Sequence, residues 1–144
     1  MDLRVVLDAN QFVSAVLVPV GHPAQIMGAW RRGEMDVLVS PPMLAEIRRV
    51  LLYPSLQGRH GWDEARVDAF LEGVRAAAIP TPGTTTVSEV VDDPSDDKYL
   101  ACALEGSAQY IVTGDEHLLR LDPWRGIRIV RPAAFLETAL RRAG

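Results

Sequence analysis

Apolar residues in this chain fall into short blocks with two different periods. Short runs rich in Val, Ile and Leu predict β-strands, and these cover residues 3–7, 36–40, 87–91, 109–113 and 127–130. Stretches with an apolar residue every three or four positions, bounded by Asn, Ser, Pro or Gly, predict helices. These cover residues 11–18, 23–32, 41–53, 63–78, 95–105, 116–121 and 132–142. Residues 54–61 and 80–83 are predicted to be loops.

The alternation of strands and helices predicts the fold class. Parallel strands joined by helical crossovers form a central sheet covered on both faces. We therefore expect a three-layer α/β/α sandwich with a mainly parallel sheet. The break at residues 80–83 is read as a loop, because neither side could bury a core alone, so residues 1–144 form a single domain.

Four acidic residues interrupt the apolar pattern. Asp8 closes the first predicted strand and Asp115 follows the strand at residues 109–113, whereas Glu46 and Asp97 lie on or beside the apolar stripe of a helix. Ligands of parallel sheets bind beyond the carboxyl ends of the strands. Acids are rarely buried unless they are paired or bind a cation. A cluster of carboxylates at this edge predicts a Mg²⁺ or Mn²⁺ site for phosphodiester cleavage.

Each acid also has a simpler explanation. Asp8 and Asp115 suit the turn or helix cap that follows a strand, and Glu46 suits a solvated helix flank. Asn10 offers its own cap for residues 11–18, which leaves Asp8 free for another task. Taken together, the four acids favour a site, because all fall at the same predicted edge of the sheet.

Asp97 has a neighbouring rival in Asp96. Asp97 heads an apolar stripe with Leu100, Ala101 and Leu104, whereas the corresponding set for Asp96 is less apolar. Both lie in a first helical turn, where the helix dipole stabilises any anion.

Composition narrows the functional class. The net charge of −4 and the pI of about 5.3 argue against a protein that coats nucleic acid through overall charge. Cys102 is the only cysteine, so no intramolecular disulfide is possible, and its apolar context predicts a buried helix residue. Neither a signal sequence nor an apolar stretch of membrane-spanning length is found, so we expect a cytoplasmic protein with no membrane partner.

Other chemistries fit less well. The histidines and the cysteine have no zinc-site spacing, and His117 is predicted to be a helix-surface residue. A phosphate-binding glycine loop is absent from the sequence. A phosphoryl-accepting receiver domain also gathers acids at strand ends, but it usually needs a lysine after its last strand, and the only lysine here, Lys98, lies on a helix.

The chain resembles a PIN domain over nearly its whole length. The matching segments, in the same order, are VVLDANQFVSAVL, LAEIRRVL, DDPSDDKYLACALEG, YIVTGDEHLLRL and GIRIVRPAAFLE. The resemblance is greatest to bacterial PIN proteins of type II toxin–antitoxin pairs, which are similar to VapC-type ribonucleases. It implies a parallel-sheet α/β/α fold, a Mg²⁺- or Mn²⁺-dependent endoribonuclease that acts as a toxin, a homodimer and a cognate antitoxin partner.

The resemblance also assigns roles. Of the two neighbouring acids, it selects Asp97. Its catalytic residues correspond to Asp8, Glu46, Asp97 and Asp115, with Asp8, Asp97 and Asp115 as metal ligands and with Asn10 and Thr113 supporting them. One departure is Ala9, where the family usually has Thr or Ser. This departure keeps an alternative open, in which the domain is catalytically idle and binds RNA or a protein.

Overall fold

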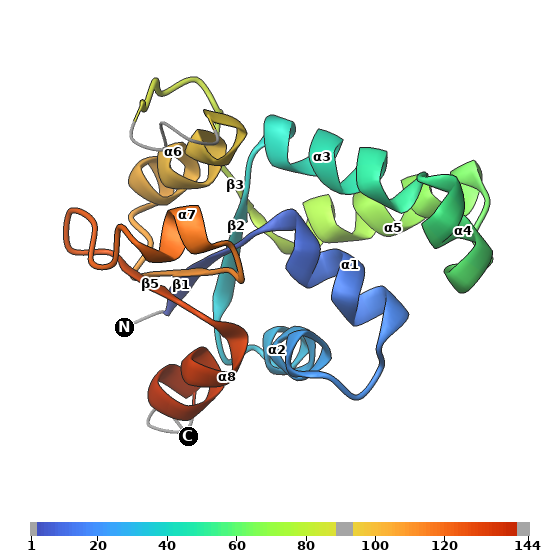
Figure 1. Ribbon diagram of the computed structural model, residues 1–144, viewed down its shortest axis with the longest axis horizontal. Coiled ribbons are helices and arrows are strands. Elements are labelled where there is room, and N and C mark those ends of the chain that lie inside the picture. The colour runs from blue at the N-terminus through green and yellow to red at the C-terminus, as the bar shows by residue number, and fades with distance from the viewer. Residues whose placement is uncertain (1–2, 89–93, 141–144) are drawn as a thin grey trace.

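The computed structural model describes residues 3–88 and 94–140, and its centre is a five-stranded parallel sheet (Figure 1). The strand order is β3-β2-β1-β4-β5, and every neighbouring pair is parallel. The strands are β1 (Arg4–Leu7), β2 (Asp36–Val39), β3 (Ile79–Pro80), β4 (Tyr110–Val112) and β5 (Arg128–Val130). The predicted α/β fold class is confirmed.

Helices surround this sheet. They are α1 (Ala9–Leu17), α2 (His22–Arg31), α3 (Pro41–Leu51), α4 (Pro54–His60), α5 (Glu64–Ala77), the 3₁₀ turn η1 (Pro94–Asp96), α6 (Asp97–Gly106), α7 (Glu116–Leu119), α8 (Pro132–Phe135) and the π-helical η2 (Leu136–Leu140). Figure 1 shows α6 on one side of the strands and the group α1, α3 and α5 on the other. Helix α6 packs across β1, β2 and β4, while α3 contacts both α1 and α5.

Two predicted local structures were wrong. Residues 54–60 form a helix rather than a loop, because Pro54 occupies a first-turn position and Gly61, with φ of 71°, ends the helix in the left-handed conformation. The edge strand lies at Ile79–Pro80, where we expected a loop; an edge position tolerates the missing N–H of proline. The strand predicted at 87–91 is absent at residues 87 and 88, and its remainder lies outside the described residues.

The core includes residues of α1, α2, α3 and α5 as well as those of α6 and the sheet, and one part of it lies between α6 and the sheet. Cys102 is fully buried there, as predicted, and burial raises the pKa of its thiol to about 11, with Thr81 Oγ1 donating to Sγ at 3.4 Å. The close approach of α6 to β2 requires glycine at position 106. A Cβ atom there would lie 2.4 Å from Cδ1 of Leu38, which is itself fully buried.

No single helix in the described part of the chain is long and apolar enough to cross a membrane. Helices α1 and α2 pass that test only as a pair, and they are bent by 99° relative to each other.

We expect the substitution Gly106→Ala to lower the free energy of unfolding by about 1–3 kcal/mol, the usual cost of overpacking a core. The matched control is Gly73→Ala in α5, where an added Cβ meets nothing within 4 Å. That variant should be more stable by about 0.5–1 kcal/mol, because alanine favours the helix. Urea unfolding of both variants measures the difference. A Gly106→Ala protein at least as stable as the control would contradict this account of the packing.

Candidate metal centre

Asp8 and Thr113 lie side by side because of the register between β1 and β4. Leu7 is paired with Val112, and the next backbone N–H, that of Asp8, donates to Val112 O at 3.2 Å. The two following side chains therefore emerge together at the carboxyl ends of adjacent strands. The Thr113 hydroxyl donates a hydrogen bond to Asp8 Oδ2.

Asp8 is also the N-cap of α1. Its Oδ1 accepts from the backbone N of Gln11 at 3.2 Å and from Gln11 Nε2 at 3.3 Å. The helix accordingly begins at Ala9, and the prediction that Asn10 caps it was wrong. Asn10 lies on the first turn of α1, where it is exposed. Asp8 thus serves both the helix and the strand-end cluster.

The buried carboxylate of Asp8 is costly to ionise. Only 4% of the residue is exposed, and this burial raises the pKa of the carboxyl above the ordinary range of aspartate. Hydrogen bonds from Thr113 and Gln11 lower that pKa, whereas the negative charge of Asp115 raises it further. Within the described part of the chain, the groups that hydrogen-bond to this carboxylate are neutral.

Asp115 continues the arrangement from β4 into α7. Its backbone N–H donates to Thr113 Oγ1 at 3.0 Å, and its Oδ1 accepts from the backbone N of His117 at 2.8 Å, which caps α7. The ring of His117 lies beside the same carboxylate, with Nδ1 3.7 Å from Oδ1. One hydroxyl therefore contacts both Asp8 and Asp115.

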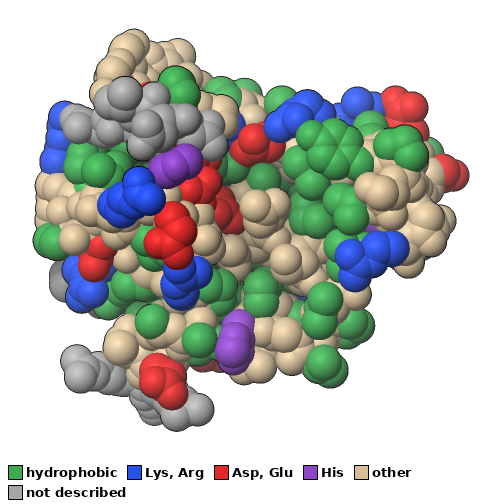
Figure 2. Space-filling view, viewed as in Figure 1, with side chains coloured by type: hydrophobic (Ala, Val, Ile, Leu, Met, Phe, Trp, Pro, Cys, Tyr) green, Lys and Arg blue, Asp and Glu red, His purple; other side chains and the backbone are tan. Residues whose placement is uncertain are grey.

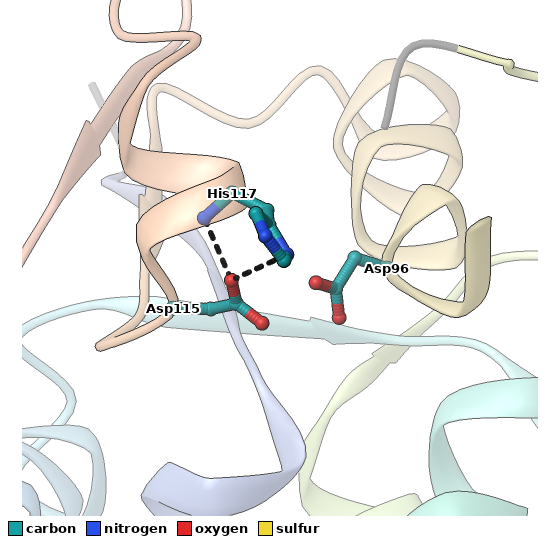
Figure 3. Close-up of side chains that lie close together, drawn as sticks. All are labelled: Asp96, Asp115 and His117. Carbon is teal, nitrogen blue, oxygen red and sulfur yellow. Dashed lines mark hydrogen bonds and ion pairs between the residues drawn. The ribbon is translucent and has the colours of Figure 1, made fainter. Parts of the chain in front are cut away.

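Asp96 faces Asp115 and His117 from the start of α6. It ends η1 and is 8% exposed. One potential ligand atom from each of Asp96, Asp115 and His117 lies within 4.8 Å of the others, and Figure 3 shows the three side chains converging between α7 and the start of α6. In Figure 2, acidic side chains and a histidine gather in a hollow of this face, with basic side chains on either side.

Asp97 lies elsewhere. It is the first residue of α6 and lines a separate hollow of about 180 Å³ together with Ser40, Gly83 and Thr85. Asp96 ends η1 and Asp97 begins α6, so the two side chains leave the backbone in different directions. The geometry thus groups Asp115 with Asp96, the rival residue, rather than with Asp97.

Glu46 stands outside the group formed by Asp96, Asp115 and His117, and Tyr99 connects it to the backbone of Ala9, the residue after Asp8. Tyr99 Oη donates to Glu46 Oε2 and accepts from the backbone N of Ala9 at 3.1 Å. Lys98 Nζ lies 3.2 Å from Oε2 of the same glutamate. Burial and the neighbouring carboxylate raise the pKa of Tyr99, so the phenol remains a neutral donor at ordinary pH.

A second cation completes the surroundings of Glu46. Arg49 Nη2 lies 3.2 Å from Oε1. Two cations and a phenol therefore hold the Glu46 carboxylate in place, and its side chain is only 17% exposed. Its negative charge is largely balanced within the protein, unlike that of Asp8.

The sequence did not indicate that Tyr99 and Lys98 contact Glu46, or that His117 lies beside Asp115. Tyr99 sits on the apolar stripe of α6, where an aromatic residue is most simply read as core. His117 carried one signal, since it follows Asp115 by two residues at a strand-to-helix turn. Lys98 was notable as the only lysine, but nothing in the pattern links it to Glu46.

Comparison with known proteins identifies the family. The PIN domain profile matches residues 4–117, a segment that runs from β1 to His117. The uncharacterized protein MJ1680 of Methanocaldococcus jannaschii is 31% identical over 121 residues, which cover 84% of this chain and 76% of that protein. The chain therefore belongs to the PIN domain family. PIN domains are generally nucleases, and they generally use divalent metals.

The residues at this site suit such an ion. Mg²⁺ and Mn²⁺ prefer carboxylate oxygens, and Asp96 and Asp115 offer these within 4.8 Å of each other. Asp8 lies outside that group and is joined to Asp115 through the Thr113 hydroxyl. The negative charge of Asp115 raises the pKa of Asp8, and a cation near both carboxylates would relieve this effect. The donor set therefore fits the group that the family implies.

We expect the metal-free Asp8→Asn protein to be more stable than the wild type at about pH 7. A carboxyl whose pKa is raised by folding binds its proton more tightly in the folded state. The free energy of unfolding of the wild type therefore falls as the pH rises from the ordinary aspartate range towards the raised value. Asparagine does not titrate, so the difference should vanish at about pH 3.

Urea unfolding in the presence of a chelator, measured across this pH range, tests the expectation. Added Mn²⁺ should stabilise only the wild type. A variant less stable than the wild type at about pH 7 would overturn this account of Asp8 burial.

Proposed function

We propose that this PIN domain is an endoribonuclease that uses Mg²⁺ or Mn²⁺, with Asp8, Asp96 and Asp115 as the metal ligands. The observation that carries the proposal is that the Thr113 hydroxyl joins Asp8 to Asp115 beyond the ends of β1 and β4, with Asp96 close to Asp115. A divalent ion bound there lowers the pKa of a water molecule and stabilises negative charge on a phosphate.

The remaining residues prepare this site. Thr113 donates to Asp8 and accepts from the backbone of Asp115, so it fixes the relative orientation of the two carboxylates. Tyr99 fixes Glu46 against the backbone of Ala9. Glu46 is then available to orient water at the rim rather than to bind the ion directly, because Lys98 already pairs with it.

The charge of the surface supports a phosphate-rich polymer as the substrate. Basic side chains lie on both sides of the acidic hollow in Figure 2, although the whole chain is acidic. Local cations of this kind attract the phosphodiester backbone without sequence preference. The VapC-like pattern of the sequence favours RNA over DNA.

We expect Asp8→Asn and Asp96→Asn to reduce metal-dependent RNA cleavage by about 100-fold or more, because each removes a negative ligand. Asp97→Asn is the matched control, since it removes the same charge one residue away from the cluster. It should retain activity within about tenfold of the wild type. Cleavage of single-stranded RNA with Mg²⁺ or Mn²⁺, and with a chelator as the blank, provides the measurement.

Three results would count against parts of this proposal. Undiminished cleavage by Asp8→Asn would reject the metal centre. A greater loss in Asp97→Asn than in Asp96→Asn would restore Asp97 as the ligand. Metal binding by a wild-type protein that cleaves no RNA would favour the idle PIN domain, for which Ala9 is the sequence argument.

The resemblance to toxins also leads us to propose a homodimer and an antitoxin partner. An apolar hollow of about 720 Å³ between α1, α2 and α5 supports a protein partner, since large apolar pockets of this kind often bind one. Its aromatic lining residues are Phe12, Trp30, Trp62 and Phe70.

We expect the purified chain to have twice the monomer mass of 15.8 kDa. Light scattering after size-exclusion chromatography, over a range of concentrations, measures that mass. A monomer at every concentration would reject the dimer and leave the nuclease proposal untouched.

A further inference from the structure

We propose that His117 supplies a nitrogen ligand to the metal centre and thereby makes that centre prefer Mn²⁺ over Mg²⁺. The inference rests on the proposed function, in that it assumes a divalent ion bound by Asp96 and Asp115. It adds a ligand of a different chemical type to the carboxylate set, and it chooses between the two ions.

The distances suit a shared ion. Two ligand atoms that each lie about 2.1 Å from one ion are about 3.0 Å apart at a right angle and about 4.2 Å apart on opposite sides. The separation of 3.7 Å between His117 Nδ1 and Asp115 Oδ1 falls inside this range. The ligand atoms of Asp96, Asp115 and His117 all lie within 4.8 Å of one another. A small rotation of the side chains would bring all three within bonding distance of one ion.

The position of the imidazole is determined by the fold. The backbone N of His117 donates to Asp115, and the next residue, Leu118, is fully buried and anchors α7 in the core. The His117 side chain is 37% exposed, so it lies at the open side of the group, accessible to an incoming ion. Figure 3 shows the ring directed towards the space between Asp115 and Asp96.

A comparison with His60 shows what a structural histidine looks like in this protein. His60 uses both ring nitrogens within the fold, with Nε2 2.9 Å from Leu51 O and Nδ1 accepting from the backbone N of Trp62 at 2.9 Å. His117 instead presents a ring nitrogen to a carboxylate at 3.7 Å, which is too long for a hydrogen bond. The simpler explanation of that contact is a surface ion pair, which contributes little to stability.

The chemistry of the ligands gives the metal preference. Mg²⁺ is small, requires near-ideal octahedral geometry and is bound through oxygen. Transition-metal ions also accept imidazole nitrogen. The imidazole of His117 therefore adds a protein ligand to the carboxylates for Mn²⁺, with water completing the coordination, whereas Mg²⁺ leaves the imidazole position to water.

The test measures bound Mn²⁺ directly, without reference to cleavage. Electron spin echo envelope modulation detects a ¹⁴N nucleus bonded to Mn²⁺, and the full chain is compared with the variants His117→Gln and His22→Gln. His22 is exposed at the start of α2 and serves as the matched control. We expect ¹⁴N coupling in the wild type and in His22→Gln, and none in His117→Gln.

Equilibrium titration adds the selectivity. His117→Gln should weaken Mn²⁺ binding by about 10- to 100-fold and Mg²⁺ binding by less than about threefold. Circular dichroism should show an unchanged fold, because the backbone of His117, not its ring, completes the cap of α7. Absence of ¹⁴N coupling in the Mn²⁺-loaded wild type, its persistence in His117→Gln, or equal weakening of both ions would each overturn the inference.

The same titration separates this inference from the proposed function. Asp8→Asn should lose affinity for both ions, since it removes a carboxylate rather than an imidazole. If the wild type binds both ions through Asp8 but shows no nitrogen coupling, the carboxylate centre stands and the role of His117 fails. If the wild type binds neither ion, both proposals fail together.

Discussion

The pairing of β1 with β4 is the constraint on which the site depends. It sets Asp8 beside Thr113, and the threonine hydroxyl then joins Asp8 to the backbone of Asp115. A shift of one residue in this register would turn every side chain to the opposite face of the sheet. The fully buried β-branched residues of these strands oppose such a shift, so the core that stabilises the sheet also sets the geometry of the carboxylates.

Two carboxylates in this region have different neighbours. Asp8 is buried among neutral donors and beside a second acid, and folding raises its pKa. Glu46 is surrounded by Lys98, Arg49 and the phenol of Tyr99, which balance its charge. Among the described residues, Glu46 is therefore paired with two cations, whereas the groups that hydrogen-bond to Asp8 are neutral.

The sequence predicted the fold and part of the site for identifiable reasons. The buried parallel strands are continuous apolar runs, and Asp8 and Asp115 follow two of them, so these acids could be placed at one edge of the sheet in advance. The choice between Asp96 and Asp97 could not be made from the stripe of α6, because a 3₁₀ turn precedes that helix and changes the direction of its first side chains. Helix α4 was missed because Pro54 was read as a break rather than as a first turn. Tyr99 contacts residues far away in the sequence, and His117 contacts Asp115 across a tight turn. The hydrophobic periodicity of a sequence predicts neither kind of contact.

The double use of Asp8 links two surfaces that lie on the same helix. Asp8 caps α1, and the following turns of α1 supply Phe12, Ala15 and Val16 to the wall of the apolar hollow. A molecule that binds in the hollow and shifts α1 would also shift its N-cap residue, Asp8, which is a carboxylate of the candidate metal centre. By thermodynamic reciprocity, such a molecule and the ion change each other's affinity by the same factor. The first turn of α1 thus connects the wall of the apolar hollow to the carboxylate of Asp8.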